Sequence, residues 1–526
     1  EKLMVTNRPA VNFAVIPSEI DNKKKLAKEM SPIIGKTPQY IIEKISEGKQ
    51  SPFQAKILAK DLEKDNIIAI EEQKYKYRGI LLSVQPERKY LYHNLASHVL
   101  GYVNEISQAE LKSERFASLA GGDIVGKTGL ERYYDSYLRG EKGKKEVEVD
   151  ALGREIMTLE LVKPVAGNDI YLTIDSDLQQ YAETMLQGEK GAIVVSEPAT
   201  GRILVMVSQP SYDPNLFTQE ISLKQWEQIS QSKENVLINN NIQGIYPPGS
   251  VFKLITAIAA LEEGVTGLDN QVYCPGYFEL GDLTFKCWKE QGHGSQNIIN
   301  AIKNSCNVYF YTMGKKLGID NLKKYANMFG LGKKTGIDLP GELEGLVPSR
   351  AWKQKTFDQI WYPGDTINLS IGQGYLLATP FQIHNMVSAI ANDGLVYRPF
   401  YLEKVVSPNG EVIQKNKPEL LQEIPVSQNT FAVIKEGMRG VVQEGTGWKA
   451  RMEDIPLAGK TGTAQNPQGE NHAWFVGFAP YQDPKICITV FVAHGGDGSQ
   501  AAAPLAKKVI QRYFKSKPEM MVKIEE

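Results

Sequence analysis

The stretch Tyr246-Pro-Pro-Gly-Ser-Val-Phe-Lys253 leads into an apolar segment, residues 251–261, that is predicted to be a helix. The Pro-Pro-Gly turn places Ser250 at the start of this helix, and a spacing of three places Lys253 one turn later on the same side. The helix dipole favours an alkoxide, and a lysine among apolar neighbours can act as a general base. Alone, the pair is also compatible with a capping serine and a lysine that lays its stem along apolar surface.

A second motif, Lys303-Asn-Ser-Cys-Asn307, is followed by the aromatic run Val308-Tyr-Phe-Tyr311. Ser305 can relay a proton, and Asn307 can direct its amide toward a peptide substrate from the same loop. Taken alone, this motif is equally compatible with a turn or a helix cap.

A third motif, Lys-Thr-Gly-Thr, begins at Lys460, just before the last predicted hairpin. Lys460 offers a cation for a carboxylate, and the hydroxyls of Thr461 and Thr463 can bind that carboxylate. Gly462 allows a substrate backbone to approach closely, and a strand edge here could pair with an extended peptide. The alternative is an ordinary strand that contains a glycine.

Three of the four cysteines fall in one short segment that also holds a histidine, which gives the set Cys274, Cys287, His293 and Cys306. Four soft or borderline ligands suit tetrahedral zinc, although the spacing is not that of a zinc finger. The alternatives are a Cys274 to Cys287 disulfide, separate buried thiols, and a His293 that is only hydrogen-bonded. Because Cys306 lies inside the Ser-Cys-Asn motif, a metal would brace this loop and perform no chemistry on a substrate.

With 526 residues, of which 42% are hydrophobic, the chain is too long for one ordinary core, and we expect two or three domains. The 60 basic residues nearly cancel the 61 acidic ones, which argues against a nucleic-acid partner. No stretch approaches the length of about 18 apolar residues that a membrane-spanning helix needs. The chain begins at Glu1 without an initiator Met, so we expect it to be trimmed from a longer protein. The absence of a membrane anchor from this sequence therefore says nothing about the native protein.

The first region is mixed in character and rather polar, and it contains no recognisable catalytic constellation. Helix starts are indicated where Thr37 and Ser51 each place a capping hydroxyl before a proline. Pro and Gly at 163–167 then predict a domain boundary. The predicted elements are strands at 11–16, 79–84 and 145–149, and helices at 40–45, 53–58 and 130–137.

The second region is more regular, and its strands lie at both ends of a helical middle. This order predicts an α+β fold, in which an antiparallel sheet is flanked by helices and preceded by a mixed α/β domain. We predict domains at 1–167 and 168–515, and a polar tail at 516–526. The predicted elements are a strand at 169–174, a helix at 178–186 capped by Ser176, and hairpins of 192–196 with 203–207 and of 473–478 with 486–492.

Ser-x-x-Lys, Ser-x-Asn and Lys-Thr-Gly occur in the chain order and approximate spacing of the penicillin-recognising serine enzymes. Further matches are Gly364-Asp-Thr-Ile-Asn-Leu-Ser-Ile-Gly-Gln-Gly374 with Ala378-Thr-Pro380, and Glu444-Gly-Thr-Gly447. Together these motifs resemble a class B penicillin-binding protein, most closely one of the penicillin-binding protein 2 type.

The resemblance covers essentially the whole chain. The first ten residues resemble the point just after the membrane-proximal segment of such proteins, and stretch 122–131 resembles part of their non-catalytic domain. That stretch contains a second Lys-Thr-Gly, Lys127-Thr-Gly129, to which we assign no catalytic role. The resemblance implies a non-catalytic pedestal or dimerisation-type domain at 1–167 and a serine D,D-transpeptidase domain at 168–515.

The activity implied is that of a peptidoglycan D,D-transpeptidase in cell-wall elongation. Ser250, deprotonated by Lys253, would attack the carbonyl between the two terminal D-alanines of a stem peptide. Ser305 and Lys253 would protonate the leaving D-alanine, and an amine from a neighbouring stem peptide would resolve the acyl-enzyme. A β-lactam would acylate the same serine and stay.

The resemblance also implies the substrate contacts. Main-chain N–H groups of Ser250 and Thr463 would form the oxyanion hole. Lys460, Thr461 and Thr463 would bind the terminal carboxylate, and Asn307 would bind the peptide amide. No cofactor is required for catalysis, and zinc would be structural, since some relatives look to have metal ligands in this insertion.

The implied location is the bacterial inner membrane, with a single-pass anchor outside this sequence and the catalytic domain in the extracytoplasmic space. The N-terminal region would dock a SEDS-family glycan polymerase and other elongation proteins. The alternatives are a β-lactam sensor or scaffold, and a D,D-carboxypeptidase or β-lactamase of the same fold. The long preceding domain and the Gly-Gln-Gly segment at 372–374 favour the cross-linking enzyme.

Overall fold

The computed structural model describes residues 1–46, 52–53, 55–150, 155–218, 221, 223–232, 234–467 and 469–520. The chain forms two compact units, and each takes a segment from the other side of residue 167. A division at one residue therefore does not reproduce the units, and the predicted domain bounds stay a prediction. Unit 1 comprises Glu1–Asn94, Gly101–Gly167 and Asp213–Gln228, and unit 2 comprises Leu95–Leu100, Asn168–Tyr212 and Ile229–Glu526.

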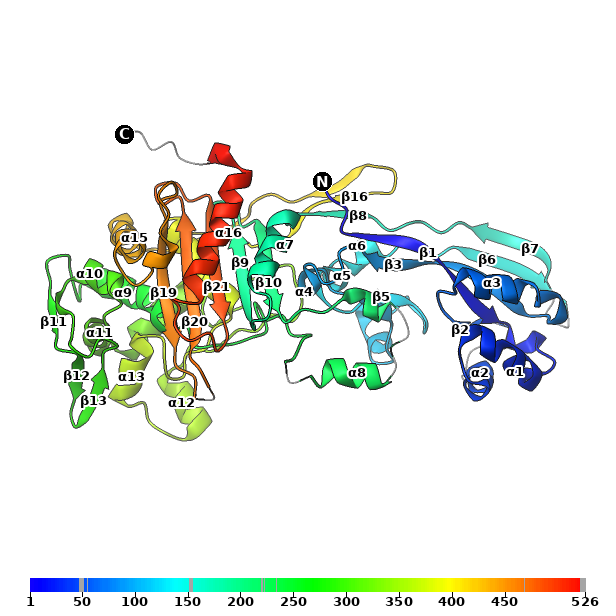
Figure 1. The fold of residues 1–526 in the computed structure, drawn as a ribbon, viewed down its shortest axis with the longest axis horizontal. Helices are drawn as coiled ribbons and strands as arrows, with labels where there is room; N and C mark the ends of the chain where they lie inside the picture. Colours follow the sequence, from blue (N-terminus) through cyan, green and yellow to red (C-terminus); the bar gives the residue numbers. More distant parts are fainter. Residues whose placement is uncertain are drawn as a thin grey trace. The chain divides into compact units, whose positions relative to one another are not determined.

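Unit 1 is built around a three-stranded antiparallel sheet in the order β2–β1–β3. β1 (Val5–Val15) pairs with β3 (Ile80–Tyr90) along its whole length and with β2 (Lys56–Ala59) at its end. Helices α1 (Lys23–Ile34), α2 (Pro38–Ser46) and α3 (Lys64–Glu71) pack apolar residues against these strands (Figure 1). Further elements of this unit are the pairs β4 (Val103–Glu105) with β5 (Ile124–Gly126) and β6 (Lys144–Val149) with β7 (Glu155–Val162), and helices α5 (Gly129–Tyr133) and α6 (Asp135–Leu138).

The strands predicted in unit 1 are confirmed, and its helices are confirmed in part. The Thr37 hydroxyl accepts a hydrogen bond from the Tyr40 N–H and caps α2 as predicted. The helix predicted at 53–58 is wrong, because residues from Lys56 pair with β1 as strand β2. Its proposed cap, Ser51, lies outside the described residues. The helix predicted at 130–137 is interrupted at Tyr134, which separates α5 from α6.

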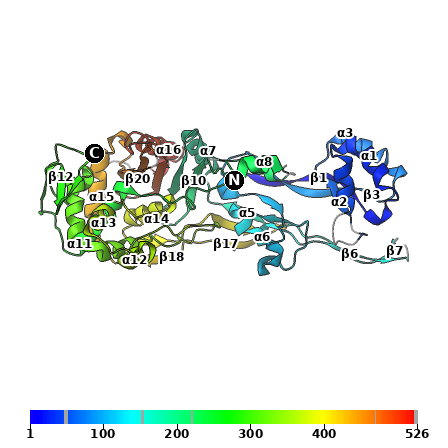
Figure 2. The ribbon, with the colours of Figure 1, turned by 90° about the horizontal axis from the view of Figure 1, so that it is seen from below.

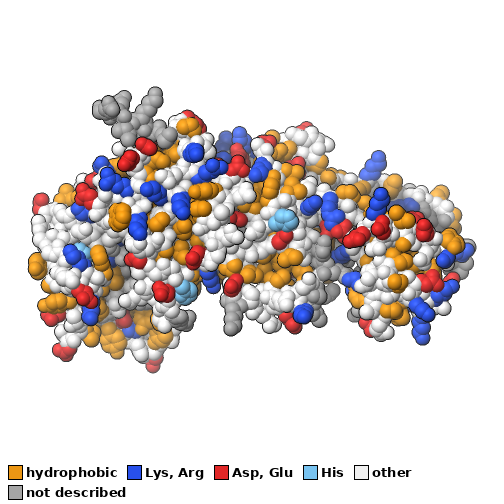
Figure 3. Space-filling model, in the orientation of Figure 1, with side chains coloured by type: hydrophobic (Ala, Val, Ile, Leu, Met, Phe, Trp, Pro, Cys, Tyr) orange, Lys and Arg blue, Asp and Glu red, His pale blue; other side chains and the backbone are white. Residues whose placement is uncertain are grey.

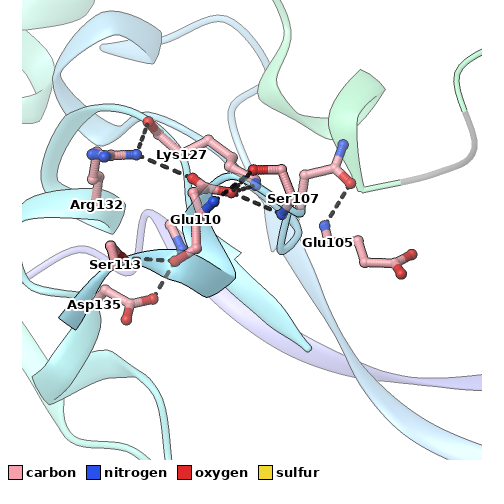
Figure 4. Close-up of polar contacts among 9 residues, drawn as sticks. Glu105, Ser107, Glu110, Ser113, Lys127, Arg132 and Asp135 are labelled. Atoms are coloured by element: carbon pink, nitrogen blue, oxygen red, sulfur yellow. Dashed lines mark hydrogen bonds and ion pairs between the residues drawn. The ribbon is translucent and has the colours of Figure 1, made fainter. Parts of the chain in front are cut away.

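The stretch 122–131 has a structural role in unit 1. Lys127 and Arg132 both donate hydrogen bonds to the carboxylate of Glu110, which also accepts from Ser107 (Figure 4). Burial opposes ionisation of Glu110, but the hydrogen bonds from Lys127 and Ser107 lower its pKa to about 2. The first Lys-Thr-Gly of the chain thus belongs to an ion-pair cluster.

Unit 2 is built around a five-stranded antiparallel sheet whose order, β10–β9–β21–β20–β19, puts β19 at an edge. Both faces are covered, which is why β9, β20 and β21 are buried at every residue and read as continuous apolar runs. The strands are β9 (Gly191–Ser196), β10 (Ile203–Gln209), β19 (Ala458–Ala464), β20 (His472–Ala479) and β21 (Ile486–Val492).

Two helical layers cover this sheet, which confirms the predicted α+β arrangement. α7 (Ser176–Met185) and α16 (Ala502–Ser516) pack on one face (Figure 1). α9 (Lys253–Glu262), α11 (Asn307–Met328), α14 (Pro380–Ala391) and α15 (Gln428–Gln443) belong to the core on the other face (Figure 2). The predicted cap of α7 is wrong by one residue, because the Asp175 carboxylate accepts from the Leu178 N–H and Ser176 is already helical.

The Cys/His segment forms a small insertion between α9 and α10 (Ile298–Lys303). Its strands pair as β11 (Val272–Cys274) with β14 (Gly294–Gln296) and β12 (Tyr277–Leu280) with β13 (Leu283–Lys286).

Elsewhere in the chain lie the helices α4 (Ser97–Leu100), α8 (Leu223–Ser230), α12 (Arg350–Phe357) and α13 (Pro363–Ser370). Two small sheets complete the fold: β17 (Val412–Lys415), β16 (Leu402–Val406) and β8 (Asp169–Leu172), and the pair β15 (Leu395–Tyr397) with β18 (Leu420–Glu423).

No helix in the described part of the chain is both long and apolar enough to cross a membrane. Acidic and basic side chains are mixed over the face drawn in Figure 3, as the nearly balanced composition predicts. The predicted tail begins at the last residue of α16, and residues 521–526 lie outside the described residues.

Candidate active site

Ser250 lies in a 3-10 turn, Gly249–Phe252, that runs directly into α9. The α-helix itself therefore begins at Lys253, two residues later than the predicted start. Gly249 has φ +54, and a Cβ there would come within 2.8 Å of the Thr463 carbonyl oxygen. Only glycine suits both conditions, so the turn can press against β19 and place Ser250 beside that strand.

Lys253 is fully buried and is held by the second predicted motif. Its Nζ donates hydrogen bonds to the Ser305 carbonyl at 2.8 Å, to Ser305 Oγ at 3.1 Å and to Asn307 Oδ1 at 2.7 Å. Burial lowers the pKa of Lys253 to about 8, against the opposing effect of the Cys306 and Cys287 thiols. An appreciable fraction of this amine is therefore neutral near pH 8 and able to accept a proton.

Ser305 is held between two buried lysines. Its φ is +51, a left-handed conformation that is uncommon for a residue with a side chain. Lys460, on β19, donates from Nζ to Ser305 Oγ at 2.9 Å and to the Thr461 carbonyl at 3.0 Å. Burial, with a smaller effect of Lys253, holds the pKa of Lys460 well below its usual range. The Ser305 hydroxyl can thus exchange a proton with either amine.

The Ser250 hydroxyl is half-buried and free for a substrate. Within the described ranges of the chain, no residue hydrogen-bonds it. Lys253 instead directs its donors to Ser305 and Asn307. Catalytic hydrogen bonds commonly tighten only once a substrate is bound, so this geometry is compatible with Ser250 as the nucleophile.

The threonines of β19 have partners that the sequence motifs did not predict. Thr461 Oγ1 lies 2.6 Å from Thr446 Oγ1, and Thr463 Oγ1 lies 3.4 Å from Asp497 Oδ2 and accepts from the Gly498 N–H. Thr446 belongs to the Glu-Gly-Thr-Gly motif, and this motif could have identified it as a residue of the site. Asp497 lies in a Gly-rich loop after β21 and carries no comparable signal.

Gly462 and Asn307, both predicted to contact a substrate, also contact other residues of the chain. A Cβ on Gly462 would come within 2.9 Å of Val251 Cγ2, so the glycine lets β19 pack against the Ser250 turn. Asn307 is the first residue of α11, and its amide accepts from Lys253 and donates to the Lys286 carbonyl at 3.3 Å. These contacts link β19, α11 and the insertion around one site.

The ligand atoms of the four Cys/His residues all lie within 4.8 Å of one another, and the residues of the set are Cys274, Cys287, His293 and Cys306. His293 Nδ1 lies 3.6 Å from the Cys274 sulfur and 3.5 Å from the Cys287 sulfur. All the cysteines are free thiols, so the alternative of a disulfide is not what the structure shows. A hydrogen bond with Cys306 lowers the pKa of the Cys287 thiol. Three sulfurs and one imidazole at this separation fit a tetrahedral zinc ion.

A family model described as the penicillin binding protein transpeptidase domain matches residues 191–511, which include all three motifs of the site. A second, described as the penicillin-binding protein dimerisation domain, matches residues 1–172. The chain belongs to the penicillin-binding proteins.

Within this family, the chain is of the penicillin-binding protein 2 (PBP2) type. It is 35% identical to the peptidoglycan D,D-transpeptidase MrdA of Acinetobacter baumannii, over 97% of this chain and 79% of that protein. A solved complex of PBP2 and MreC from Helicobacter pylori matches with a TM-score of 0.87 and 30% identity, over 98% of this chain and 96% of that chain. A structure of a peptidoglycan synthase complex matches with a TM-score of 0.76 and 29% identity, over 100% and 90% of the two chains.

In this penicillin-binding protein, the predicted residues gather at one place. Lys253, Ser305, Asn307 and Lys460 form one hydrogen-bonded network, and the turn that carries Ser250 packs against β19. The insertion contributes a residue that was not predicted, Trp288, whose indole N–H donates to the Ser305 carbonyl at 3.1 Å. A tryptophan directly after Cys287 gave no hint of this contact, because its partner is 17 residues away in the sequence.

Proposed function

We propose that this PBP2-type protein is a serine D,D-transpeptidase that cross-links peptidoglycan stem peptides during cell-wall elongation. The observation that carries this proposal is the meeting of Lys253 Nζ and Lys460 Nζ at Ser305 Oγ, next to the turn that presents Ser250. Its relatives include proteins named as peptidoglycan D,D-transpeptidases.

The first half-reaction is acylation. Ser250 Oγ attacks the carbonyl carbon between the two terminal D-alanines, and its proton passes to the neutral amine of Lys253. The C–N bond then breaks, and the leaving D-alanine takes a proton from Lys253 through the Ser305 hydroxyl. The Lys253 to Ser305 distance of 3.1 Å supports this relay.

The second half-reaction transfers the acyl group. The amine of a neighbouring stem peptide attacks the ester carbonyl and gives its proton to the Ser305 and Lys253 pair. The ester C–O bond then breaks as the new amide forms, and Ser250 Oγ takes a proton back from Lys253. Main-chain N–H groups of Ser250 and Thr463 stabilise the oxyanion in both steps. The close approach of Gly249 to the Thr463 carbonyl supports this pairing, because it brings the two backbone segments together.

The terminal carboxylate of the stem peptide binds at β19. The hydroxyls of Thr461 and Thr463 are its direct donors, and Gly462 between them keeps the strand against the Ser250 turn. Lys460 is fully buried and bonded to Ser305, so in its protonated form it would attract the carboxylate without touching it. Asn307 would bind the peptide amide of the substrate.

Cys274, Cys287, His293 and Cys306 would hold a structural zinc ion, which would anchor the loop that carries Ser305. Protein purified without added zinc should contain about one equivalent per chain, and a chelator should lower its melting temperature. Cys274→Ser should lose the metal, whereas Cys487→Ala, a buried thiol in β21, should keep it. Metal content far below one equivalent, with no effect of chelator, would count against zinc.

An anchor outside this sequence holds the protein in the bacterial inner membrane, with unit 2 in the extracytoplasmic space. Unit 1 docks a SEDS-family glycan polymerase and other elongation proteins. The solved relatives include a PBP2–MreC complex and a peptidoglycan synthase complex, which supports such assembly. Failure of a full-length, membrane-anchored form to copurify with or stimulate such a polymerase would contradict this part of the proposal.

The deciding experiment is intact-protein mass spectrometry after incubation with benzylpenicillin. We expect one adduct on the native chain that persists for hours and is absent from Ser250→Ala. An adduct that is lost rapidly would indicate a β-lactamase or carboxypeptidase. No adduct on the native chain would contradict an assembled serine site, and a stable adduct without cross-linking of stem peptides would indicate a sensor.

A further inference from the structure

The catalytic turn at residues 304–307 is held from outside by the Cys/His insertion. The Trp288 indole N–H donates to both the Asn304 and the Ser305 carbonyl oxygens, each at 3.1 Å. The Asn304 amide donates to Gln296 at the end of β14, and the Asn307 amide donates to the Lys286 carbonyl. The insertion thus contacts the turn on both sides of Cys306.

This support matters because the turn is in an unfavourable conformation. Ser305 has φ +51, a left-handed conformation that is unfavourable for a residue with a side chain, so the surroundings must hold it. The Ser305 carbonyl is shared by two donors, Trp288 Nε1 at 3.1 Å and Lys253 Nζ at 2.8 Å. A shift of this carbonyl therefore moves an acceptor that Lys253 and Trp288 share.

Trp288 does not behave as a core residue. The residue is 58% exposed, so apolar burial alone does not account for its position. Its ring instead meets the His293 ring edge-on, with centroids 5.2 Å apart, and the cluster residue Cys287 precedes it. The insertion fixes the indole, and the indole N–H points at the catalytic turn.

We propose that Trp288 is a positioning residue for Ser305: its indole N–H, held in place by the Cys/His insertion, fixes the left-handed turn whose hydroxyl Lys253 and Lys460 share. This inference rests on the proposed serine mechanism and adds to it a link between the insertion and the proton relay. Trp288 acts through Ser305.

The test compares two Trp→Phe variants of the whole chain. Trp288→Phe keeps the ring and removes only the N–H donor, and Trp448→Phe makes the same change at a tryptophan that is 59% exposed in the same unit. Stopped-flow acylation by a fluorescent penicillin separates the dissociation constant of the initial complex from the acylation rate constant. We expect Trp288→Phe to lower the rate constant about fivefold, the effect of one lost hydrogen bond, and to leave the dissociation constant and metal content unchanged.

A second measurement keeps the proposal testable if Trp288→Phe folds poorly. Hydrogen exchange of peptides that cover residues 304–308 should be faster than native in Trp288→Phe and native-like in Trp448→Phe, when both are compared below their melting temperatures. An acylation rate constant within about twofold of native, or slower acylation without faster exchange in this peptide, overturns the proposal. If the native chain itself is not acylated, the proposed serine mechanism is wrong. If the native chain is acylated and Trp288→Phe reacts at the same rate, only the role proposed for Trp288 is wrong.

Discussion

Lys253 and Lys460 share one acceptor: their ammonium nitrogens lie 3.1 Å and 2.9 Å from the Ser305 hydroxyl oxygen. Both lysines are fully buried, so two full charges here would be costly. Burial lowers the pKa of Lys253 to about 8 and holds that of Lys460 well below its usual range. Burial therefore raises the neutral fraction of the amines beside Ser305, which favours a proton acceptor inside the site.

Acylation by a β-lactam should become faster as the pH rises through about 8. The folded pKa of Lys253, about 8, lies below its ordinary value of 10.5, so the neutral base accumulates over this range. The free energy of unfolding should also rise between about pH 8 and 10, because the unfolded chain then binds more protons than the folded chain. Stopped-flow acylation at fixed ionic strength from pH 6 to 9.5 measures the first effect. A flat profile would contradict the assignment of Lys253 as the base.

Ser305→Ala should slow acylation about a hundredfold or more, because the proton relay and the acceptor shared by the two lysines are lost together. The rate constant with a fluorescent penicillin is the measurement. Ser295→Ala, at an exposed serine of β14, is the matched control and should react like the native chain. A native-like rate in Ser305→Ala would show that Lys253 acts without the relay.

The two Lys-Thr-Gly sequences should respond differently to the same substitution. Lys460→Met removes a donor to Ser305 Oγ, and we expect it to suppress acylation. Lys127→Met removes a donor to Glu110, and we expect it to lower the melting temperature while acylation by penicillin stays native-like. Equal loss of acylation in both variants would contradict the assignment of only the Lys-Thr-Gly at Lys460 to the active site.

Gly462→Ala should slow acylation and destabilise the protein by about 1–3 kcal/mol, the usual cost of overpacking. The new Cβ would lie 2.9 Å from Val251 Cγ2 and 3.0 Å from Trp474 Cβ, so β19 must move away from the Ser250 turn. At the control site, Gly364→Ala, the new Cβ would meet Phe285 at an ordinary 3.5 Å. Urea unfolding and penicillin acylation of both variants test this. A native-like Gly462→Ala would show that the strand tolerates the side chain.

The sequence was sufficient to predict much of the fold because its signals were local. Continuous apolar runs at 192–196 and 486–492 predicted the central strands, and Thr37 before a proline predicted the start of α2. The three motifs predicted which residues meet in space, since their chain order resembled that of a known family. Lys253 and Lys460 both lie within hydrogen-bonding distance of Ser305, and the roles that the resemblance implied for these residues stay predictions.

The features that could not be predicted depend on contacts between distant segments. Residues 56–59 form β2 because β1 offers them hydrogen-bonding partners, and their own sequence was compatible with a helix. Trp288 points its N–H at a carbonyl of the catalytic turn, and Asp497 reaches Thr463 from a loop after the last strand. Neither side chain lies in a motif, so only the assembled fold identifies it.

Gly249 and Gly372, which pack closely against neighbouring backbone beside Ser250, limit how the site can change under antibiotic selection. A Cβ on Gly372 would lie 2.1 Å from the Gly249 carbonyl oxygen, and one on Gly249 would lie 2.8 Å from that of Thr463. Backbone meets backbone at both points, so no side chain larger than hydrogen fits without moving the nucleophile. Resistance substitutions that preserve wall synthesis are therefore expected away from these two glycine contacts, at positions where a new side chain does not displace Ser250.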